Sequence, residues 1–457
     1  MRWSAVTTSP VGELADHLAS ALSVELPAEV VEKTSLHIID SVTAAVSGML
    51  LDPGVRVRGY VESMAGSGPA TVFGTGIRTS VPYAALANGM AAHADETDDS
   101  LPPLGSIRTH PGCSVVPSAI AVAEAQGSSG MDLIRAVALG YEYASRFAMA
   151  LWSTYEAAIL EVSSVAVANV FGSSAASAAL LGVDADTARH VFSYAVQHAS
   201  GLNTFFRGEG HVEKAYVFGG MPSFNATSLA LMVHSGWRGV ADVFDGSPSF
   251  FTLGPCPDPS RLTTDLGVTH EIMRARFKRY PVGSPIQSPL EAMLGLMRDH
   301  QLGTEDIAKV EIRISPPRYE VCHGRNMSSV NVEYLIETAL LDGDLTFGNA
   351  HDEERFDAWR AGRPDSRVVI VADPAFGDGH GASATIVTHA GDTHHRMIPH
   401  IPGSVENPLT PAQVEEKAAG LLVPALGDRR TAGLLDALRR LPDLADVREL
   451  QQWLYVG

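Results

Sequence analysis

The stretch HPGCSVVPSAIAVAEAQGSSGMDLIRAVALGYEYASRFAMALW, residues 110–152, decides the fold class of this protein. It consists of two long runs rich in alanine and larger apolar residues, separated by the glycine- and serine-rich segment 127–130. Apolar runs of this length predict helices, and glycine is a common residue at a helix end. The many small residues would let the helix axes approach closely. We therefore expect two buried helices within a bundle.

Similar runs lie on both sides of this stretch. Residues 30–50, 81–96, 169–202 and 221–237 are predicted to be helical, with a proline in the first turn of the second run. Asp184 follows a glycine and is the expected N-cap of a helix. Residues 11–253 are therefore predicted to form a helical bundle with a buried centre.

The pattern changes in the second half of the chain. Residues 308–314, 366–373 and 382–398 alternate as strands do, with a hairpin turn expected at residues 391–392. Helical segments 330–343 and 349–362 lie between them, and helices return at 411–422 and 430–441. The predicted fold class is mainly α: a large helical domain built from residues 1–265 and 403–457, with a smaller α+β lid domain, residues 266–402, inserted. An insertion of this kind is expected to form a cleft at the junction.

Composition excludes several classes of protein. The chain has 33 basic and 52 acidic residues, a net charge of −19, and no basic run, so we expect no nucleic-acid partner. A locally positive pocket could still bind an anion. Cys113, Cys256 and Cys322 are odd in number and widely spaced, which favours three reduced thiols over a disulfide framework or a metal site. No signal core and no uncharged apolar stretch of membrane-spanning length is present, so we expect a cytoplasmic protein without a membrane partner.

An acidic segment between two histidines raises the question of function. It contains Asp95, Glu96, Asp98 and Asp99, with His93 before it and His110 after it. Four adjacent carboxylates repel one another and must meet water, cations or hydrogen-bond donors. Spacing alone favours a solvated loop. A metal site is less favoured because the glycine of a calcium loop is missing. In a third interpretation, one or two acids face the cleft while the others hold the loop, and His110, at a helix start, has a lowered pKa suited to proton transfer.

Two groups of cations are candidates for anion binding. Lys214 lies among glycine and aromatic residues, near Arg207 and His211, where it could act as a base or hold a carboxylate. A surface lysine with a buried stem explains the same pattern equally well. Lys278 and Arg279 would form either a cationic wall of the cleft or an exposed basic turn.

Tyr334 is a candidate phenolic donor, although most helical tyrosines are packing residues. The sequence has no P-loop, no dinucleotide fingerprint and no GxSxG motif.

Several stretches together resemble the MmgE/PrpD family, whose members include dehydratases, a decarboxylase and an epimerase of small carboxylic acids. The matching pieces run in order along nearly the whole chain: ANGMAAHADETDDS, THPGCSVVPSAIAVAEAQGSSGMDLIRAVALGYEYASR, FGSSAASAALLGVD, EKAYVFGG, FKRYP, YLIETALLDG and PGSVENPLTPAQVEEK. The resemblance implies a helical domain with an inserted lid, a homodimer, a small carboxylate substrate, and no metal or organic cofactor.

The resemblance also implies site residues. The family motif NGxxxHxxDxDD(T/S)…HP is matched here by Asn88, His93, Asp98, Asp99, Ser100, His110 and Pro111. Glu96 stands where the family usually has its first aspartate. The cleft lysine of the family corresponds to Lys214, its lid lysine to Lys278, and its lid tyrosine to Tyr334.

Two positions depart from the family pattern. Ser163 stands near a position that is usually histidine in dehydratases and decarboxylases, and Gly283 and Gln287 stand where the lid usually carries histidine. Neither serine nor glutamine donates a proton near pH 7. The scaffold is therefore expected to be retained, while the reaction could have changed.

The expected chemistry is removal of a proton next to a carboxylate or imine, with cations stabilising the enolate-like charge. We predict His110 and Lys214 for proton transfer, Asp98 or Glu96 to orient His110 or a neighbouring donor, and Tyr334 to supply a proton from the opposite side. Lys278 and Arg279 are predicted to bind carboxylate, and the substrate-binding set is completed by Glu96, Ser100, Ser163, Arg207 and Gln287. A lyase ranks first, an epimerase or isomerase second, and a non-catalytic scaffold is the remaining alternative.

Overall fold

The computed structural model describes residues 10–64, 66–102, 109–152, 162–208, 210–253, 257–362 and 366–456. The chain divides into two compact units. Unit 1 consists of Met1–Ala94, Asp98–Ala275 and Leu421–Gly457, and unit 2 consists of Arg276–Gly420 together with the three residues Asp95–Thr97. Cys113 and Cys322 are buried thiols that form no disulfide within the described residues, whereas Cys256 lies outside them.

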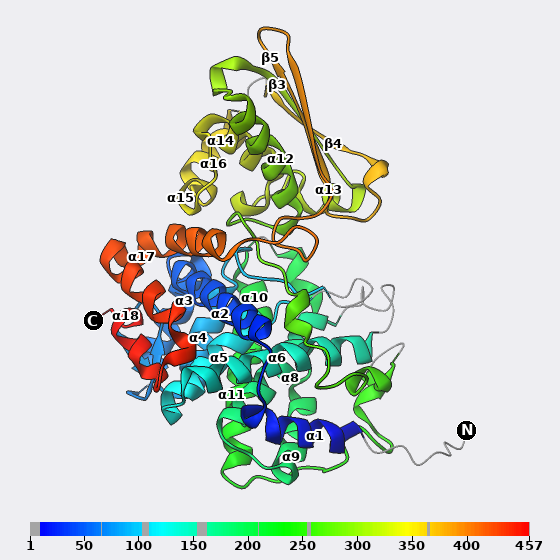
Figure 1. Cartoon of the computed structure of the whole chain (residues 1–457), viewed down its shortest axis with the longest axis vertical. Helices are drawn as coiled ribbons and strands as arrows, with labels where there is room; N and C mark the ends of the chain where they lie inside the picture. Colours follow the sequence, from blue (N-terminus) through cyan, green and yellow to red (C-terminus); the bar gives the residue numbers. More distant parts are fainter. Residues whose placement is uncertain are drawn as a thin grey trace. The chain divides into compact units, whose positions relative to one another are not determined.

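Unit 1 is helical, as predicted. Helix α6 packs along α8, and α5 packs against both α6 and α4 (Figure 1). The helices of this unit are α1 (Pro10–Ser20), α2 (Ala28–Gly48), α3 (Asp52–Met64), α4 (Val81–Ala92), α5 (Gly112–Gln126), α6 (Gly130–Leu151), α8 (Ser164–Leu180), α9 (Ala185–His198), α10 (Val212–Ala215), α11 (Met221–His234), α18 (Gln451–Leu454) and the part of α17 (Pro411–Arg439) that follows Gly420. A short hairpin, β1 (Ala70–Val72) and β2 (Ile77–Thr79), completes the unit.

The helix break predicted within residues 127–130 and the N-cap predicted at Asp184 are both present. Gly127 ends α5 with a positive φ of 66°, and the Ser129 hydroxyl caps α6 by accepting from the Asp132 amide at 3.1 Å. The Asp184 carboxylate caps α9 in the same way, accepting from the Thr187 amide at 2.8 Å. Small residues set the contact between α6 and α8: a Cβ on Gly172 would lie 2.4 Å from the Gly140 carbonyl oxygen. The predicted close approach of these helices is therefore present.

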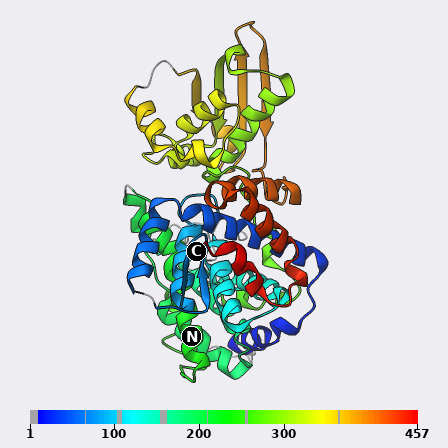
Figure 2. The same cartoon turned by 90° about the vertical axis from the view of Figure 1, so that its left-hand side faces the viewer.

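Both ends of the chain contribute to unit 1. The Gly74 amide donates to the Leu454 carbonyl at 2.8 Å, and the Val456 amide donates to Thr75 at 2.9 Å, so the C-terminal segment lies beside the β1–β2 hairpin (Figure 2). The side chain of Asn88 braces the same hairpin, accepting from the Phe73 amide at 2.9 Å.

Glu124 of α5 is a buried carboxyl that accepts from the Thr71 amide at 2.7 Å. Burial raises the pKa of Glu124 from near 4.5 to about 7, although the bond from Thr71 opposes the shift. Because the folded state keeps the proton that the unfolded state loses, stability should fall by about 3 kcal/mol as pH rises between these two values.

Glu124→Gln should remove this slope, since its amide oxygen still accepts from Thr71. We expect the melting temperatures of wild type and variant to diverge between pH 5 and pH 8, in favour of the variant, when measured by calorimetry. Parallel pH dependence of the two melting temperatures would contradict the assignment.

Unit 2 is α+β, as predicted. Its four-stranded sheet has the order β4-β3-β5-β6, with β3 and β4 parallel and the other neighbours antiparallel. Helices cover one face of the sheet (Figure 1), and Leu290, Ile312 and Leu335 lie in the core beneath them. The elements are α12 (Ser284–His300), β3 (Ile307–Ile314), α13 (Pro316–Cys322), α14 (Val332–Asp342), α15 (Phe347–Ala350), α16 (Glu353–Ala361), β4 (Val368–Ala372), β5 (Ala382–Thr388) and β6 (Thr393–Ile398). The predicted hairpin joins β5 to β6, with Gly391 at a φ of 92°.

The boundaries of the units differ from the expected ones at residues 266 and 402. Residues up to Ala275 remain with unit 1 because Glu271 bonds to α6: its amide donates to the Glu142 carboxylate at 2.8 Å, and its carboxylate accepts from Ser145. Residues 403–420 remain with unit 2, where the Phe277 amide donates to the Gly403 carbonyl at 3.2 Å. Such pairings between distant segments have no signature in the local sequence.

Within the described residues, none of the helices is by itself long and apolar enough to span a membrane. The pair α2 and α3 meets the criteria of length and composition only when taken together, across a bend of 81°.

Candidate active site

The acidic segment begins where a helix ends. Helix α4 stops at Ala92, so His93 and the residues that follow lie outside it. The chain returns through a two-way backbone pairing of Leu101 with Thr109, at 2.9 and 3.1 Å, and places His110 just before α5. This return brings the two histidines of the motif together: the ring centroids of His93 and His110 lie 5.3 Å apart.

Three aspartates of the segment are buried, and each faces a histidine. Asp98 Oδ2 lies 2.9 Å from His93 Nδ1, Asp99 Oδ2 lies 2.9 Å from His37 Nδ1, and Asp95 Oδ2 lies 3.0 Å from His351 Nε2. The solvated-loop interpretation of this segment is therefore wrong. The carboxylates are shielded from water, and each has an imidazole nitrogen within 3.0 Å that can donate a hydrogen bond to it.

His110 is oriented by its own backbone neighbours. Its Nδ1 lies 2.7 Å from the Asp99 carbonyl oxygen, which can only accept, so Nδ1 carries the proton. Asp98 Oδ2 lies 3.4 Å from the same nitrogen. The other ring nitrogen, Nε2, is then the basic one in the neutral ring. A carboxylate close to Nδ1 also stabilises the imidazolium that forms when Nε2 takes a proton.

Asn169 of α8 links two backbone segments near the His110 ring, one at His110 itself and one at Phe218. Its side-chain amide donates to the His110 carbonyl at 2.9 Å and to the Phe218 carbonyl at 2.8 Å. Phe218 lies in the π-helical turn Tyr216–Gly220, a type of helix distortion frequent at functional sites. This turn touches α4 directly, since a Cβ on Gly219 would lie 1.9 Å from the Gly89 carbonyl oxygen. Only a residue without a side chain allows this contact.

The ring of Phe218 is the common neighbour of the predicted proton-transfer residues. Its centroid lies 5.6 Å from that of His110 and 4.7 Å from that of His93. The Lys214 Nζ lies 5.3 Å from the same centroid. The structure therefore brings His110 and Lys214 to one aromatic side chain within unit 1, with His211 beside His93 at a centroid distance of 5.3 Å.

A second layer of polar residues lies behind the histidines. The Tyr141 hydroxyl donates to Asp99 Oδ2 at 2.6 Å, and the Gly112 amide donates to Asp99 Oδ1 at 3.2 Å. Burial, and then the charge of Asp99, raises the pKa of Tyr141 well above its usual range, so its hydroxyl remains a donor. Burial lowers the pKa of Lys33 to about 8, against the opposing effect of the Asp99 and Asp40 carboxylates. Asp99 is thus held rigidly, and its carbonyl is the group that orients His110.

Unit 2 holds the other predicted cations. The buried Lys278 ammonium donates to the Glu96 carbonyl and lies 3.7 Å from Glu96 Oε2. Arg279 lies 3.2 Å from the carboxylate of Glu291. The alternative of an exposed basic turn is therefore wrong for Lys278. Both cations face carboxylates of the protein itself.

Gln287 is not available to bind a substrate. Its amide oxygen accepts from the backbone amides of Arg279 and Tyr280, at 2.9 and 3.0 Å, and its nitrogen donates to the carbonyls of Tyr280 and Val282, both at 2.9 Å. Both donors and both lone pairs of the amide are occupied. The predicted substrate contact is corrected: Gln287 fixes the segment that carries Lys278 and Arg279.

Tyr334 belongs to the core of unit 2. Its ring packs against Phe356 and Trp359, and it is among the largest fully buried side chains. Its hydroxyl lies within donating distance of the carbonyls of Asn349, at 3.2 Å, and Asp352, at 3.3 Å. The predicted role as a proton donor to substrate is corrected, because both the ring and the hydroxyl are used internally. Tyrosine at a helical core position is indistinguishable from a catalytic one in sequence.

The remaining predicted residues occupy different surroundings. Ser163 is buried and caps α8, accepting from the Ala166 amide at 3.3 Å, so it is occupied structurally. Ser100 is half-buried and adjoins Asp99. Arg207 is exposed at the end of the short helix Asn203–Arg207.

One set of potential metal ligands lies within unit 1. One ligand atom each from His93, Asp98 and Cys113 falls within 4.8 Å of the others. The Cys113 thiol, however, donates to the His110 carbonyl at 3.1 Å. A metal binds the thiolate, so occupation would break the bond that helps to hold His110. For these three residues, the hydrogen bond of the Cys113 thiol fits proton transfer at His110 better than metal coordination.

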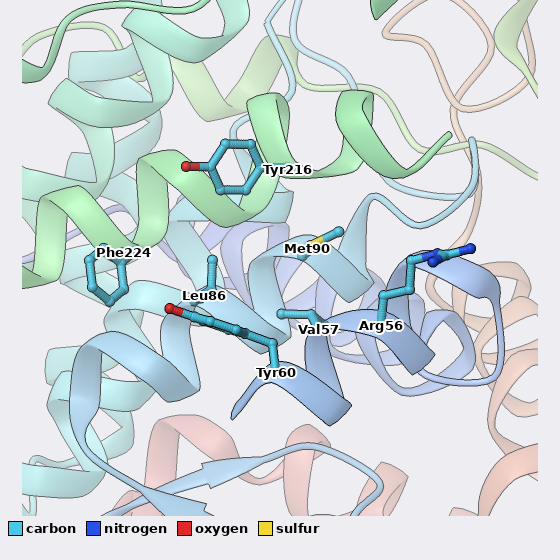
Figure 3. Close-up of a pocket in the computed structure, with 7 residues that line it drawn as sticks. All are labelled: Arg56, Val57, Tyr60, Leu86, Met90, Tyr216 and Phe224. Carbon is cyan, nitrogen blue, oxygen red and sulfur yellow. The ribbon is translucent and has the colours of Figure 1, made fainter. Parts of the chain in front are cut away.

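The helical unit also has an apolar hollow of about 430 Å³ (Figure 3). It is lined by Arg56, Val57, Tyr60, Leu86, Met90, Tyr216 and Phe224. Its one charged side chain, Arg56, is paired with Asp52 at 2.8 Å. None of the predicted site residues lines this hollow, and its apolar walls do not suit a carboxylate.

Comparison with known families decides the classification. The MmgE/PrpD N-terminal domain model matches residues 12–253, and the MmgE/PrpD C-terminal domain model matches residues 280–440. The chain belongs to the MmgE/PrpD family. Its relatives include the cis-aconitate decarboxylase of Mus musculus, 22 % identical over 93 % of this chain and 89 % of that protein. Those of Homo sapiens and Aspergillus terreus are 26 % and 25 % identical, each over 71 % of this chain and 68 % and 71 % of their own lengths.

Some residues of this MmgE/PrpD site were not predicted. Lys33, His37 and Asp40 lie at intervals of four and three on helix α2, and this spacing could have indicated a polar face. His93 was matched to the family motif but given no role. Asn169 carries no signal in sequence, since it is a single amide in an alanine-rich helix.

Proposed function

We propose that this protein is a cofactor-independent lyase that acts on a small carboxylic acid through proton transfer at His110. The observation that carries the proposal is the fixed orientation of that ring, with Nδ1 at 2.7 Å from the Asp99 carbonyl. Lys214, at the same Phe218 ring, supplies a cation for a substrate carboxylate. The decarboxylase relatives support a lyase over other reaction classes.

The proposed residues can serve a decarboxylation. The carbon–carbon bond to the departing carboxylate breaks, carbon dioxide leaves, and the electron pair moves into the adjacent unsaturated acid. An imidazolium at His110 then delivers its Nε2 proton to carbon, with Asp98 stabilising the charged ring beforehand. In a dehydratase, the neutral ring would instead remove a proton from carbon at Nε2, the carbon–oxygen bond would break as the double bond forms, and the imidazolium would return that proton to the departing hydroxyl group, which leaves as water.

An epimerase is the second candidate. It needs a proton removed from one face of a carbon and returned to the other, with no leaving group. Ser163 and Gln287 favour this alternative, because both stand where lyases of the family usually carry histidine and both are occupied by backbone bonds. Epimerisation has no departing hydroxide and therefore requires fewer acids than dehydration does.

A panel of di- and tricarboxylic acids, including cis-aconitate, separates these reactions in deuterium oxide. Loss of carbon dioxide or water, followed by NMR, supports the lyase, and solvent deuterium incorporated without net loss supports the epimerase. Whichever reaction the wild type catalyses, its rate should be lower in Lys214→Met by about 10²-fold or more. If the protein neither turns over any acid of the panel nor exchanges its protons, the proposal is overturned and the non-catalytic scaffold is favoured.

A further inference from the structure

Lysine is rare in this chain, and two of the lysines are buried. Of 33 basic residues only five are lysine, at positions 33, 214, 278, 309 and 417. Lys309 is half exposed, at 49 % of its side chain. Lys278 and Lys417 are buried, at 1 % and 8 %. Burying an ammonium group is unfavourable unless hydrogen-bond partners replace the lost water, so each partner of Lys417 shows which segment the side chain holds in place.

One partner of Lys417 lies in the acidic segment. The Lys417 ammonium donates to the Thr97 carbonyl at 2.9 Å, across 320 positions of sequence. Lys278 bonds to Glu96, and His351 Nε2 lies 3.0 Å from Asp95 Oδ2. Each of the three residues Asp95–Thr97 therefore has its own cationic partner in unit 2. We call the contacts of Lys417 and His351 with this segment the latch.

His351 is arranged to be charged. Its Nε2 faces the Asp95 carboxylate, and its Nδ1 lies 2.9 Å from the Phe347 carbonyl, so both ring nitrogens meet acceptors and both carry protons. Burial alone would lower the pKa of His351, but the bond to Asp95 and its charge, with a smaller effect of Glu353, raise it. The Tyr334 hydroxyl lies against the Asn349 and Asp352 carbonyls, on either side of His351 in sequence. The corrected role of Tyr334 is thus to support the latch.

The segment Asp95–Thr97 also has internal hydrogen bonds. The Asp95 carboxylate accepts from the Thr97 amide at 2.8 Å and from its hydroxyl at 2.5 Å. Release of Asp95 or of the Thr97 carbonyl would free a peptide that is continuous with Asp98, and His93 precedes it by two residues. The conformation of three residues therefore limits where the aspartate and the histidine of the motif can lie.

We propose that His351 and Lys417 are positioning residues that hold Asp95–Thr97 in one conformation and so keep Asp98 and His93 in register for proton transfer. The mechanical part of this inference stands on the contacts alone, and its kinetic part rests on the proposed function.

Hydrogen exchange tests the mechanical part without a substrate. In Lys417→Met, which keeps the length of the side chain but removes its donor, we expect exchange of the amides of residues 95–99 to rise by about tenfold or more, as in local opening. His351→Gln should raise exchange in the same peptide. Lys309→Met makes the same replacement at an exposed lysine and should change nothing there.

Two outcomes would overturn the latch. One is unchanged exchange at residues 95–99 in Lys417→Met and His351→Gln variants that melt cooperatively. The other is an increase spread evenly over unit 2, which would show general loosening.

With an acid that the wild type turns over, kcat of Lys417→Met should fall by about tenfold or more while KM changes little, and Lys417→Arg should restore most of it. Unchanged kcat would remove the kinetic role. If the wild type turns over no acid, the proposed function fails, while the exchange result still decides the latch.

Discussion

Replacing His110 with asparagine is expected to lower kcat for the carboxylic acid substrate by about 10³-fold, within the usual range for a lost general acid or base. Asparagine can place an amide N–H where Nδ1 lies and donate to the Asp99 carbonyl, so the fold should survive. It cannot take or return a proton at neutral pH. The measurement is kcat and KM for the acid identified in the panel, together with a melting curve.

His234→Asn is the matched control for this experiment. His234 lies in the same unit, in the last turn of α11, and is exposed. It should keep wild-type kinetics. A His110→Asn enzyme that folds and turns over within threefold of the wild type would remove His110 from the chemistry.

The second large effect is expected for Asp98→Asn. One oxygen of Asp98 lies 2.9 Å from His93 Nδ1 and 3.4 Å from His110 Nδ1, so a single carboxylate serves two imidazoles. Asparagine keeps the shape but removes the charge that stabilises an imidazolium. We expect kcat to fall by about 10²-fold or more, with a smaller change in KM, because the charge acts while the ring is protonated.

Asp16→Asn, on the exposed face of α1, is the matched control, because it removes the same charge away from the site. The two variants should differ in kcat and agree in the far-ultraviolet circular dichroism spectrum. If Asp98→Asn raised KM alone, Asp98 would serve substrate binding and the proton would be transferred elsewhere.

These expectations depend on how the acidic segment is buried. From the sequence alone, four neighbouring carboxylates predict a solvated loop, because no nearby residue in the sequence offsets their repulsion. The compensating groups come from elsewhere: His37 from α2, His351 from the end of α15, and Lys278 from the segment before α12. Their sequence separation from the acids is large, and no periodicity connects them.

Tyr334 and Gln287 are residues whose predicted contact with substrate was wrong, because the sequence does not show their tertiary partners. Both residue types bind substrates in many enzymes, and both positions lie in or near helices with polar neighbours. Tyr334 is placed in a core, and Gln287 spends its four hydrogen-bonding positions on the backbone of residues 279–282. Which polar groups face a substrate depends on hydrogen bonds that form only after the chain is folded.

The motif that carries His110 and Asp98 was found through its resemblance to the MmgE/PrpD pattern. Local chemistry by itself determined the helices of unit 1, the helix end at Gly127, the N-cap at Asp184 and the alternating strands of unit 2. These follow from interactions among residues close in sequence, which periodicity and capping rules describe. The tertiary structure alone decided which histidine faces which aspartate, that Phe218 joins His110 to Lys214, and that Lys417 reaches Thr97. Burial of a charge is settled by partners brought from distant segments, and those partners are specified by packing rather than by the local sequence.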